Sequence, residues 1–272
     1  MTTVVAADNA PLITSRAAGW INRNGPVLAA FAAIFALWEI GVRAFAIPDY
    51  LLPGPLLIAS KIISSWQLLL LNAVVTLEEI LSGFLLSVAV AIPLAVAVVY
   101  SRLFERVAFP FMVSLQTIPK VALAPILVIW LGYGILPKVM VAFLISFFPI
   151  VINSVIGMRS AEKEMIYLVQ SMGAGELTTF LKIRLPKALP SIFGGLKVGM
   201  GQAVVGATVG EFIAAENGLG YLQLISQVRL DTTLLFAAVV VLSFLGVLLF
   251  NIVGWIEQLV LPWNRVATEI VE

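Results

Sequence analysis

Long apolar runs are the feature of this sequence that most limits its fold. Of its 272 residues, 61% are apolar and 11% are charged, whereas soluble domains are about 45–50% apolar and about 25% charged. Several runs reach the roughly 20 residues that a helix needs to cross a bilayer. A very hydrophobic soluble helical protein is the alternative, but a soluble fold has no place to bury so much apolar surface. We therefore predict an all-α, polytopic membrane protein.

Six apolar runs are expected to be transmembrane helices. They lie at residues 26–47, 76–100, 107–132, 138–158, 190–213 and 233–257. They form one transmembrane domain (26–258) between an N-terminal tail (1–25) and a C-terminal tail (259–272). Residues 48–75 open with three prolines and then become amphipathic, which predicts a short interfacial helix.

The first run differs from a cleaved signal peptide. The apolar core of such a peptide has about 7–15 residues, whereas this run is longer and carries Glu39 and Arg43. We therefore expect it to be retained as a span. The two charged residues are four positions apart, so we expect them to pair on one helix face.

The basic residues predict the orientation. With six spans, both termini lie on one side of the membrane. If that side is the cytoplasm, the outer segments hold only Lys61, Lys138 and Arg229, and the inner segments hold many more Lys and Arg residues. Because cytoplasmic loops are enriched in these residues, we expect both termini to be cytoplasmic and the spans to be in contact with membrane lipid.

The third span is irregular. Pro110, Pro119 and Pro125 interrupt it, and Lys120 lies near its middle. Proline removes an amide donor, and the freed backbone groups need protein or a water-lined cavity around them. We expect a broken span that faces the protein interior, although simple proline kinks without a transport role give the same pattern.

Polar side chains within the spans are candidates for a translocation pathway, because a charge at mid-membrane costs roughly 2.5–3.5 kcal/mol on insertion scales. Lys120 either contacts the solute or binds a Glu or a backbone carbonyl inside the bundle. Glu211 lies near the outer end of span five, where solvation is the alternative to a pathway role. The candidate pathway residues are Gln116, Lys120, Asn153, Gln202 and Glu211.

Span five contains two glycine pairs with four-residue spacing, Gly195/Gly199 and Gly206/Gly210. This spacing lets two helix backbones approach closely. The pattern fits packing within one subunit and packing across a dimer equally well.

Several function classes are excluded by what the sequence lacks. It has no Cys and no His, so thiol chemistry and the usual zinc or haem ligands are absent. We expect no cofactor, no metal and no catalytic residues. No phosphate-binding G-x-x-x-x-G-K-[ST] loop is present, and the net charge of +1 gives no attraction to nucleic acid.

The polar interval 159–189 predicts a helical hairpin. Residues 161–172 form one amphipathic helix, and Gly173 to Gly175 break it, since glycine adopts left-handed backbone angles. A second helix begins near Glu176 and is expected to end at Pro186. Such a hairpin suits either the groove of another protein or the membrane interface.

Gly173, followed after nine residues by Ile183, Leu185 and Pro186, resembles the EAA loop of binding-protein-dependent ABC importer permeases. The residues at 167–169 are Tyr-Leu-Val in place of the Glu-Ala-Ala of that loop. The resemblance implies that this interval is the loop that couples to an ATPase. The coupling residues that it implies are Gly173, Ala174, Gly175, Glu176, Ile183, Leu185 and Pro186.

Further segments in the same order resemble the nitrate/sulfonate/taurine branch of this family. They are Leu52-Pro-Gly-Pro55, Ser82-Gly-Phe84 with Ile92-Pro93, Pro119 to Pro125, Ile129 to Gly134, Phe148-Pro-Ile150, Gly210-Glu-Phe212 and Gly218-Leu-Gly220.

The resemblance implies a type I ABC importer permease (MetI-like) fold and a dimer, expected to be a homodimer with a second permease copy. An ATPase subunit binds each cytoplasmic loop, and a periplasmic or lipid-anchored solute-binding protein delivers substrate to the outer face. The permease itself is then not an enzyme, and its implied location is the bacterial plasma membrane. The implied substrates are nitrate, a sulfonate such as taurine, or a vitamin precursor such as a pyrimidine or riboflavin. A secondary transporter or a membrane scaffold would lack the ATPase partner.

Overall fold

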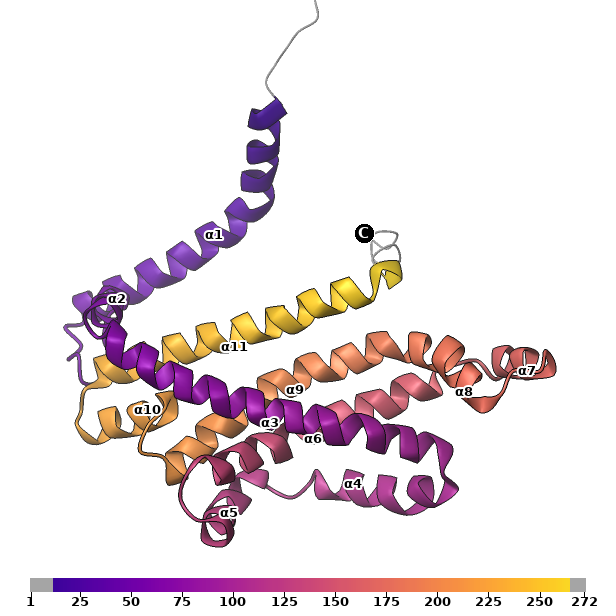
Figure 1. Ribbon diagram of the computed structural model, residues 1–272. Coiled ribbons are helices and arrows are strands. Elements are labelled where there is room, and N and C mark those ends of the chain that lie inside the picture. Colours follow the sequence, from indigo (N-terminus) through magenta and orange to yellow (C-terminus); the bar gives the residue numbers. More distant parts are fainter. Residues whose placement is uncertain (1–11, 265–272) are drawn as a thin grey trace, which may run out of the picture.

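The described part of the chain is entirely helical (Figure 1). In this computed structural model the structure describes residues 12–264. Residues 1–11 of the expected N-terminal tail and 265–272 of the C-terminal tail lie outside the described residues. The longer helices are α1 (Leu12–Ala44), α3 (Trp66–Tyr100), α6 (Ile135–Arg159), α9 (Leu185–Ala214) and α11 (Thr232–Val260). Between them lie α2 (Pro55–Ser64), η1 (Phe104–Ala108), α4 (Phe109–Leu115), η2 (Lys120–Leu123), α5 (Ala124–Leu131), α7 (Lys163–Ser171), α8 (Glu176–Thr179), η3 (Phe180–Arg184), α10 (Leu219–Val228) and η4 (Pro262–Asn264).

Among the described residues, four helices are long and apolar enough to cross a membrane: Trp66–Tyr100, Ile135–Arg159, Glu176–Ala214 and Thr232–Val260. The pair Phe104–Leu115 and Lys120–Leu131 is bent by 89° and counts as a fifth if it is one broken span. The expected break in span three is therefore confirmed. The expected span 26–47 coincides with the second half of α1, whose side chains are only partly described, and it stays a prediction.

The helix that holds the second expected span, 76–100, begins ten residues earlier, at Trp66, so the short helix before it is confined to α2. Leu69, Asn72 and Thr76 are buried in this first part of α3, so its polar residues face protein and allow the helix to start early.

Helix α6 is the centre of the bundle. In its apolar stretch 61% of the residues are buried, against 33% in α3, 44% in Glu176–Ala214 and 22% in α11. Helices α3 and α9 run alongside it (Figure 1). Ile150 and Val151, in the middle of α6, have no exposed surface.

Glycines bring α6 and α9 together, which settles the alternative left open for span five. A Cβ at Gly195 would lie 2.7 Å from Asn153 Cβ, and one at Gly206 would lie 2.6 Å from Ala142 Cα. Gly199 and Gly210 face α6 in the same way. Both glycine pairs therefore pack within one subunit.

The end of the bundle that carries α2, α10 and the start of α11 lies opposite the α7–α8 hairpin (Figure 1). Here Lys61 Nζ lies 2.8 Å from Asp231 Oδ2 and ties α2 to the start of α11. Burial raises the pKa of Asp231, but hydrogen bonds from Lys61 and from the N–H of Leu234, with the charge of Lys61, hold it below its usual value overall.

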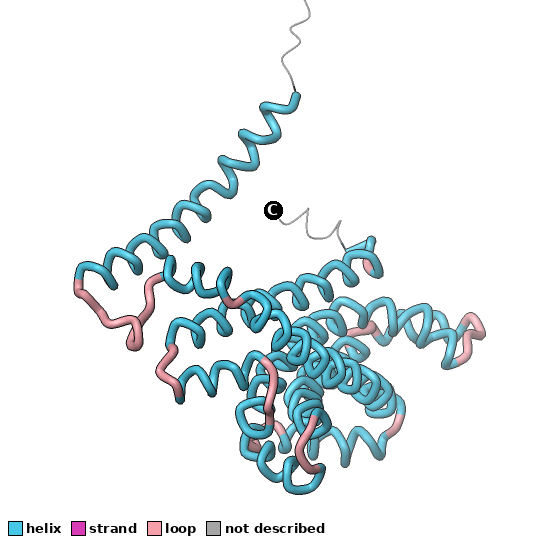
Figure 2. Tube along the Cα trace, turned by 60° about the vertical axis from the view of Figure 1, so that its left-hand side comes forward, coloured by secondary structure: helices cyan, strands magenta, loops and turns pink. Residues whose placement is uncertain are grey.

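The expected pair on the first helix is confirmed. Arg43 lies 2.6 Å from Glu39 Oε1. The second oxygen of Glu39 accepts a hydrogen bond from the N–H of Leu56 at 3.2 Å, so the end of α1 is joined to the start of α2. From there α1 runs away from the bundle (Figure 2).

We predict that Gly206→Ala lowers the stability of the detergent-solubilised protein by about 1–3 kcal/mol, because the new methyl group forces α6 and α9 apart. The matched control is Gly201→Ala, since a Cβ at Gly201 meets nothing within 4 Å. That change is expected to be neutral or stabilising, because alanine favours the helix. Thermal unfolding of both variants is the measurement, and equal melting temperatures would contradict the packing described above.

Candidate functional site

The α7–α8 hairpin turns at Gly173, whose φ of 87° lies in the left-handed region. The N–H of Ala174 donates to Val169 O at 3.2 Å, and that of Gly173 donates to Gln170 O at 2.9 Å. This pair of bonds is a Schellman motif, which closes a helix with a glycine after its C-cap. The predicted tight turn is confirmed, and glycine is required there by backbone geometry.

The hairpin returns through α8, which begins at Glu176 as expected. The prediction that Pro186 ends this helix was wrong. The chain continues through the π-turn η3 into α9, and Pro186 lies in the first turn of α9. A single π-helical turn accommodates an extra residue within a continuous helix.

The hairpin exposes apolar side chains. Tyr167, Leu168, Met172 and Leu177 are between 61% and 78% exposed, whereas Ile166 is buried. Tyr167 and Leu168 occupy the positions where the EAA loop has Glu and its first Ala. Contiguous exposed apolar surface marks an interaction site in many proteins.

Lys120 lies in η2, at the bend of the broken span. Its Nζ is 4.7 Å from the centre of the Phe148 ring on α6, a cation–π contact. Within the part of the chain that the structure describes, Lys120 forms no ion pair, so the alternative in which it binds a Glu is not supported, and its role in the pathway stays a prediction. Phe148 itself is buried.

The five candidate pathway residues do not form one cluster. Gln116, directly after α4, and Gln202, on α9, are exposed, and Lys120 and Asn153 are half-buried. Asn153 Nδ2 donates to Pro149 O within α6 at 2.8 Å. Among the described residues, no hydrogen bond or ion pair joins any two of the five.

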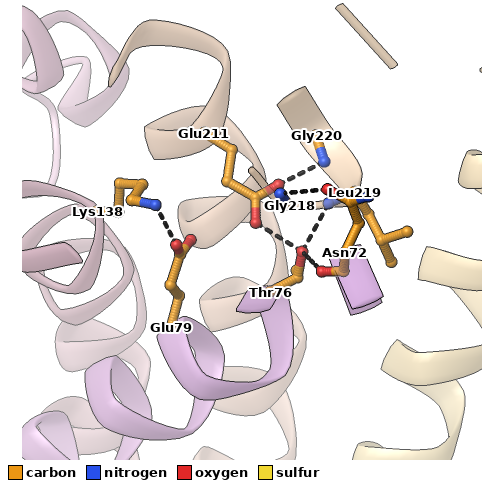
Figure 3. Close-up of polar contacts among 8 residues, drawn as sticks. All are labelled: Asn72, Thr76, Glu79, Lys138, Glu211, Gly218, Leu219 and Gly220. Atoms are coloured by element: carbon orange, nitrogen blue, oxygen red, sulfur yellow. Dashed lines mark hydrogen bonds and ion pairs between the residues drawn. The ribbon is translucent and has the colours of Figure 1, made fainter. Parts of the chain in front are cut away.

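Glu211 occupies a different environment from the one expected. It has no exposed surface, so solvation at the outer end of span five was wrong. One carboxylate oxygen accepts the hydroxyl hydrogen of Thr76 at 2.6 Å, and the other accepts the N–H of Gly220 (Figure 3).

Glu211 belongs to a clamp on the first turn of α10. The N–H of Gly218 donates to Asn72 Oδ1 at 2.7 Å, and the N–H of Leu219 donates to Thr76 Oγ1 at 2.8 Å (Figure 3). The first N–H groups of a helix have no acceptor within the helix, and here α3 and α9 supply it. A Cβ at Gly218 would lie 2.2 Å from the Glu211 carboxylate, which explains the glycine.

An ion pair between Glu79 on α3 and Lys138 on α6 lies beside this clamp (Figure 3). Both side chains are almost wholly buried. The assignment of Lys138 to an outer segment was therefore wrong, because the residue lies inside α6 and points at Glu79. The sequence signal was an acidic residue within one apolar run and a basic residue at the start of another, since intramembrane charges pair with one another.

A second pair missed at the sequence level joins Lys197 on α9 to Glu257 on α11. It holds α11 against the core at the end of the bundle nearer the hairpin. Both ion pairs join different helices, which is why no short-range spacing reveals them.

The match to a family model agrees with this architecture. Residues 83–262, more than half of the chain, match the model described as "Binding-protein-dependent transport system inner membrane component". The matched region contains α6, the hairpin, α9 and α11.

Curated relatives extend the match to most of the chain. The formylaminopyrimidine transport permease protein ThiX of Halalkalibacterium halodurans is 37% identical, over 86% of this chain and 94% of its own. The riboflavin transport system permease protein RibX of Chloroflexus aurantiacus is 36% identical, over 90% and 91%. The putative aliphatic sulfonates transport permease protein SsuC of Bacillus subtilis is 25% identical, over 86% of each chain.

Among solved structures, a chain of the inward-facing MetNI methionine ABC transporter has a TM-score of 0.62, with 18% identity, covering 72% of this chain and 98% of that chain. The expected MetI-like fold is thereby confirmed. The chain belongs to the family of inner-membrane components of binding-protein-dependent transport systems. It is a multi-pass permease subunit of an ABC importer for a small solute, and ATP hydrolysis belongs to a separate subunit.

We predict that Lys138→Met destabilises the protein by about 3–5 kcal/mol, because it leaves Glu79 buried without its partner. The double variant Glu79→Leu/Lys138→Met is expected to recover most of that loss. Thermal unfolding in detergent measures both. Glu78→Leu is the matched control, since Glu78 is the exposed neighbour on the same helix. A double variant as unstable as Lys138→Met would contradict the pairing.

Proposed function

We propose that the α7–α8 hairpin is the docking element for the ATPase subunit and lies in the cytoplasm, with both termini. The single observation that carries this is the exposed apolar surface around the Gly173 turn, on a segment that projects from the end of the bundle (Figure 1). The opposite end, with α2 and α10, then faces outward and receives solute from a soluble or lipid-anchored binding protein.

The working unit is a homodimer of this chain. The bent span supports this proposal, because Ile129, Trp130 and Tyr133 at its end are between 76% and 86% exposed within one subunit. A broken span in lipid needs protein or water around its freed backbone groups. A second copy of the chain supplies protein at this surface, and the pathway between the two copies supplies water.

Within that pathway, Lys120 is the residue most suited to meet the solute. It lies at the break of the span, and a cation–π contact rather than an ion pair holds its ammonium group. Gln116 is exposed one turn before it. Glu211, in contrast, acts in the α10 clamp, because its carboxylate oxygens already accept hydrogen bonds.

The substrate class is a small heterocyclic vitamin or vitamin precursor, in the nitrate/sulfonate/taurine branch. The relatives named for formylaminopyrimidine and riboflavin transport, at 37% and 36% identity, support it more than the sulfonate relative at 25%. A sulfonate is the second candidate, favoured by the unpaired cation of Lys120. Thermal shift of the partner binding protein with pyrimidines, flavins and sulfonates tests the choice, and a shift with sulfonates alone would overturn it.

We predict that Gly173→Asp abolishes coupled uptake while the permease still inserts, because aspartate strains the left-handed turn and reshapes the docking surface. Uptake and ATPase activity of the reconstituted transporter are the measurements. Gly194→Ala is the matched control, since Gly194 lies in α9 outside the hairpin and a Cβ there meets nothing within 4 Å. Normal uptake by correctly inserted Gly173→Asp would contradict the role of the hairpin.

We predict that Lys120→Ala raises the solute concentration for half-maximal uptake about tenfold, which corresponds to roughly 1.4 kcal/mol of binding free energy. The cause is loss of the ammonium group at the break of the span. Dimer recovery in detergent is expected to stay unchanged. Unaltered uptake kinetics together with poor dimer recovery would show a structural role instead.

A further inference from the structure

We propose that Arg159 and Arg184, which flank the hairpin, transmit its movement to the bent span. This inference rests on the hairpin being the ATPase docking element. Arg159 is the last residue of α6, and Arg184 is the last residue of the π-turn η3 that leads into α9. The two arginines therefore mark the points where the hairpin enters and leaves the bundle.

Arg159 contacts the first half of the bent span. Its Nη2 donates to Glu105 Oε1 at 3.0 Å, and its guanidinium carbon lies 5.5 Å from the centre of the Phe109 ring. Glu105 is in the π-turn η1, and Phe109 begins α4. A guanidinium group can hold a carboxylate and an aromatic face at once, which an ammonium group does less well.

Arg184 contacts the last residue of α3, just before the bent span. Its guanidinium carbon lies 5.4 Å from the centre of the ring of Tyr100, the last residue of α3. The same ring meets Phe180 edge-on at 5.9 Å. The Nε of Arg184 is buried and has no hydrogen-bond partner among the described residues, and the guanidinium group faces the Tyr100 ring.

Both arginines thus hold one short stretch, residues 100–109, where α3 passes into the bent span. Lys187 differs, because it faces Glu162 at 4.0 Å within the hairpin region itself. Both ion pairs are exposed, and exposed ion pairs contribute little to stability, so variants of either pair are expected to keep the fold.

The bundle next to the hairpin favours transmission along this route. A Cβ at Gly157 would lie 2.7 Å from Ser191 Cβ, so α6 and α9 are in close contact immediately beside the hairpin. Their ends must move together when the hairpin moves. Residues 100–109 contain the π-turn η1, and such turns are frequent at functional sites. The contacts of Arg159 and Arg184 transmit the movement of the hairpin to this stretch and from there toward Lys120.

The test uses the complete transporter, with permease, ATPase and binding protein, in liposomes. Arg159→Glu is expected to lower the solute molecules taken up per ATP hydrolysed about tenfold, and Arg159→Glu/Glu105→Arg to restore the ratio to within about twofold of the original, as a double-mutant cycle requires for a direct pair. Lys187→Glu is the matched control and should leave the ratio unchanged. Should Arg159→Glu fail to assemble, Arg159→Gln takes its place.

A second pair of variants tests the other arginine contact. Tyr100→Phe keeps the aromatic ring and should retain the uptake ratio, whereas Tyr100→Leu removes the ring and should lower it. Normal ratios in both Arg159→Glu and Tyr100→Leu, with ATPase bound and active, would overturn this proposal alone. ATPase binding by the Gly173→Asp variant is measured separately. Normal ATPase binding by that variant would overturn the docking role of the hairpin instead.

A movement measurement separates transmission from a structural effect. The chain has no cysteine, so Phe111→Cys and Lys163→Cys, both at exposed positions, can carry paired spin labels on α4 and α7. In the unaltered background, ATP should change the distance distribution between the labels only slightly, because hairpin and α4 move together. With Arg159→Glu the distribution should broaden and shift on ATP binding. An identical response in both backgrounds would contradict transmission through Arg159.

Discussion

Close contact between α6 and its two neighbours is the constraint on which the rest of the structure depends. Gly206 and Gly195 let α9 approach the backbone of α6, and Gly83 lets α3 approach it near Ala142. Between α3 and α6, the hydroxyls of Ser87 and Ser146 lie 2.6 Å apart, and both have the backbone carbonyl of Phe143 as an acceptor. Helices in lipid lack a hydrophobic driving force for association, so this close packing and these hydrogen bonds hold the three-helix core together.

The two ends of the bundle differ in their polar contacts. At one end, Asn72, Thr76 and Glu211 bind the first turn of α10, and the Glu79–Lys138 pair lies beside them. These groups are buried and paired, so this end is built to stay rigid. At the other end the contacts are exposed, the backbone contains two π-turns, and the hairpin shows apolar surface. This contrast fits a permease that receives mechanical input at the hairpin end.

Local sequence patterns predicted the parts of the site that local geometry determines. The Gly173 turn followed from its glycine, and the broken span followed from its prolines, because both residues act on the backbone where they stand. Pro186 was misjudged because a π-turn carries the helix past it. Glu79, Lys138 and Lys197 were missed because their partners lie on other helices. The helix α10 was missed because its first turn depends on acceptors from α3 and α9.

The central claim is that the α7–α8 hairpin is the surface through which ATP hydrolysis drives this permease. Site-directed crosslinking tests it most directly, because the chain has no native cysteine. A single cysteine at Leu177, on α8, should crosslink to the ATPase subunit in native membranes, with a yield that changes when ATP is added. A cysteine at Tyr50, exposed at the opposite end, should give no such product. Crosslinking to the ATPase from position 50 and none from position 177 would contradict the account.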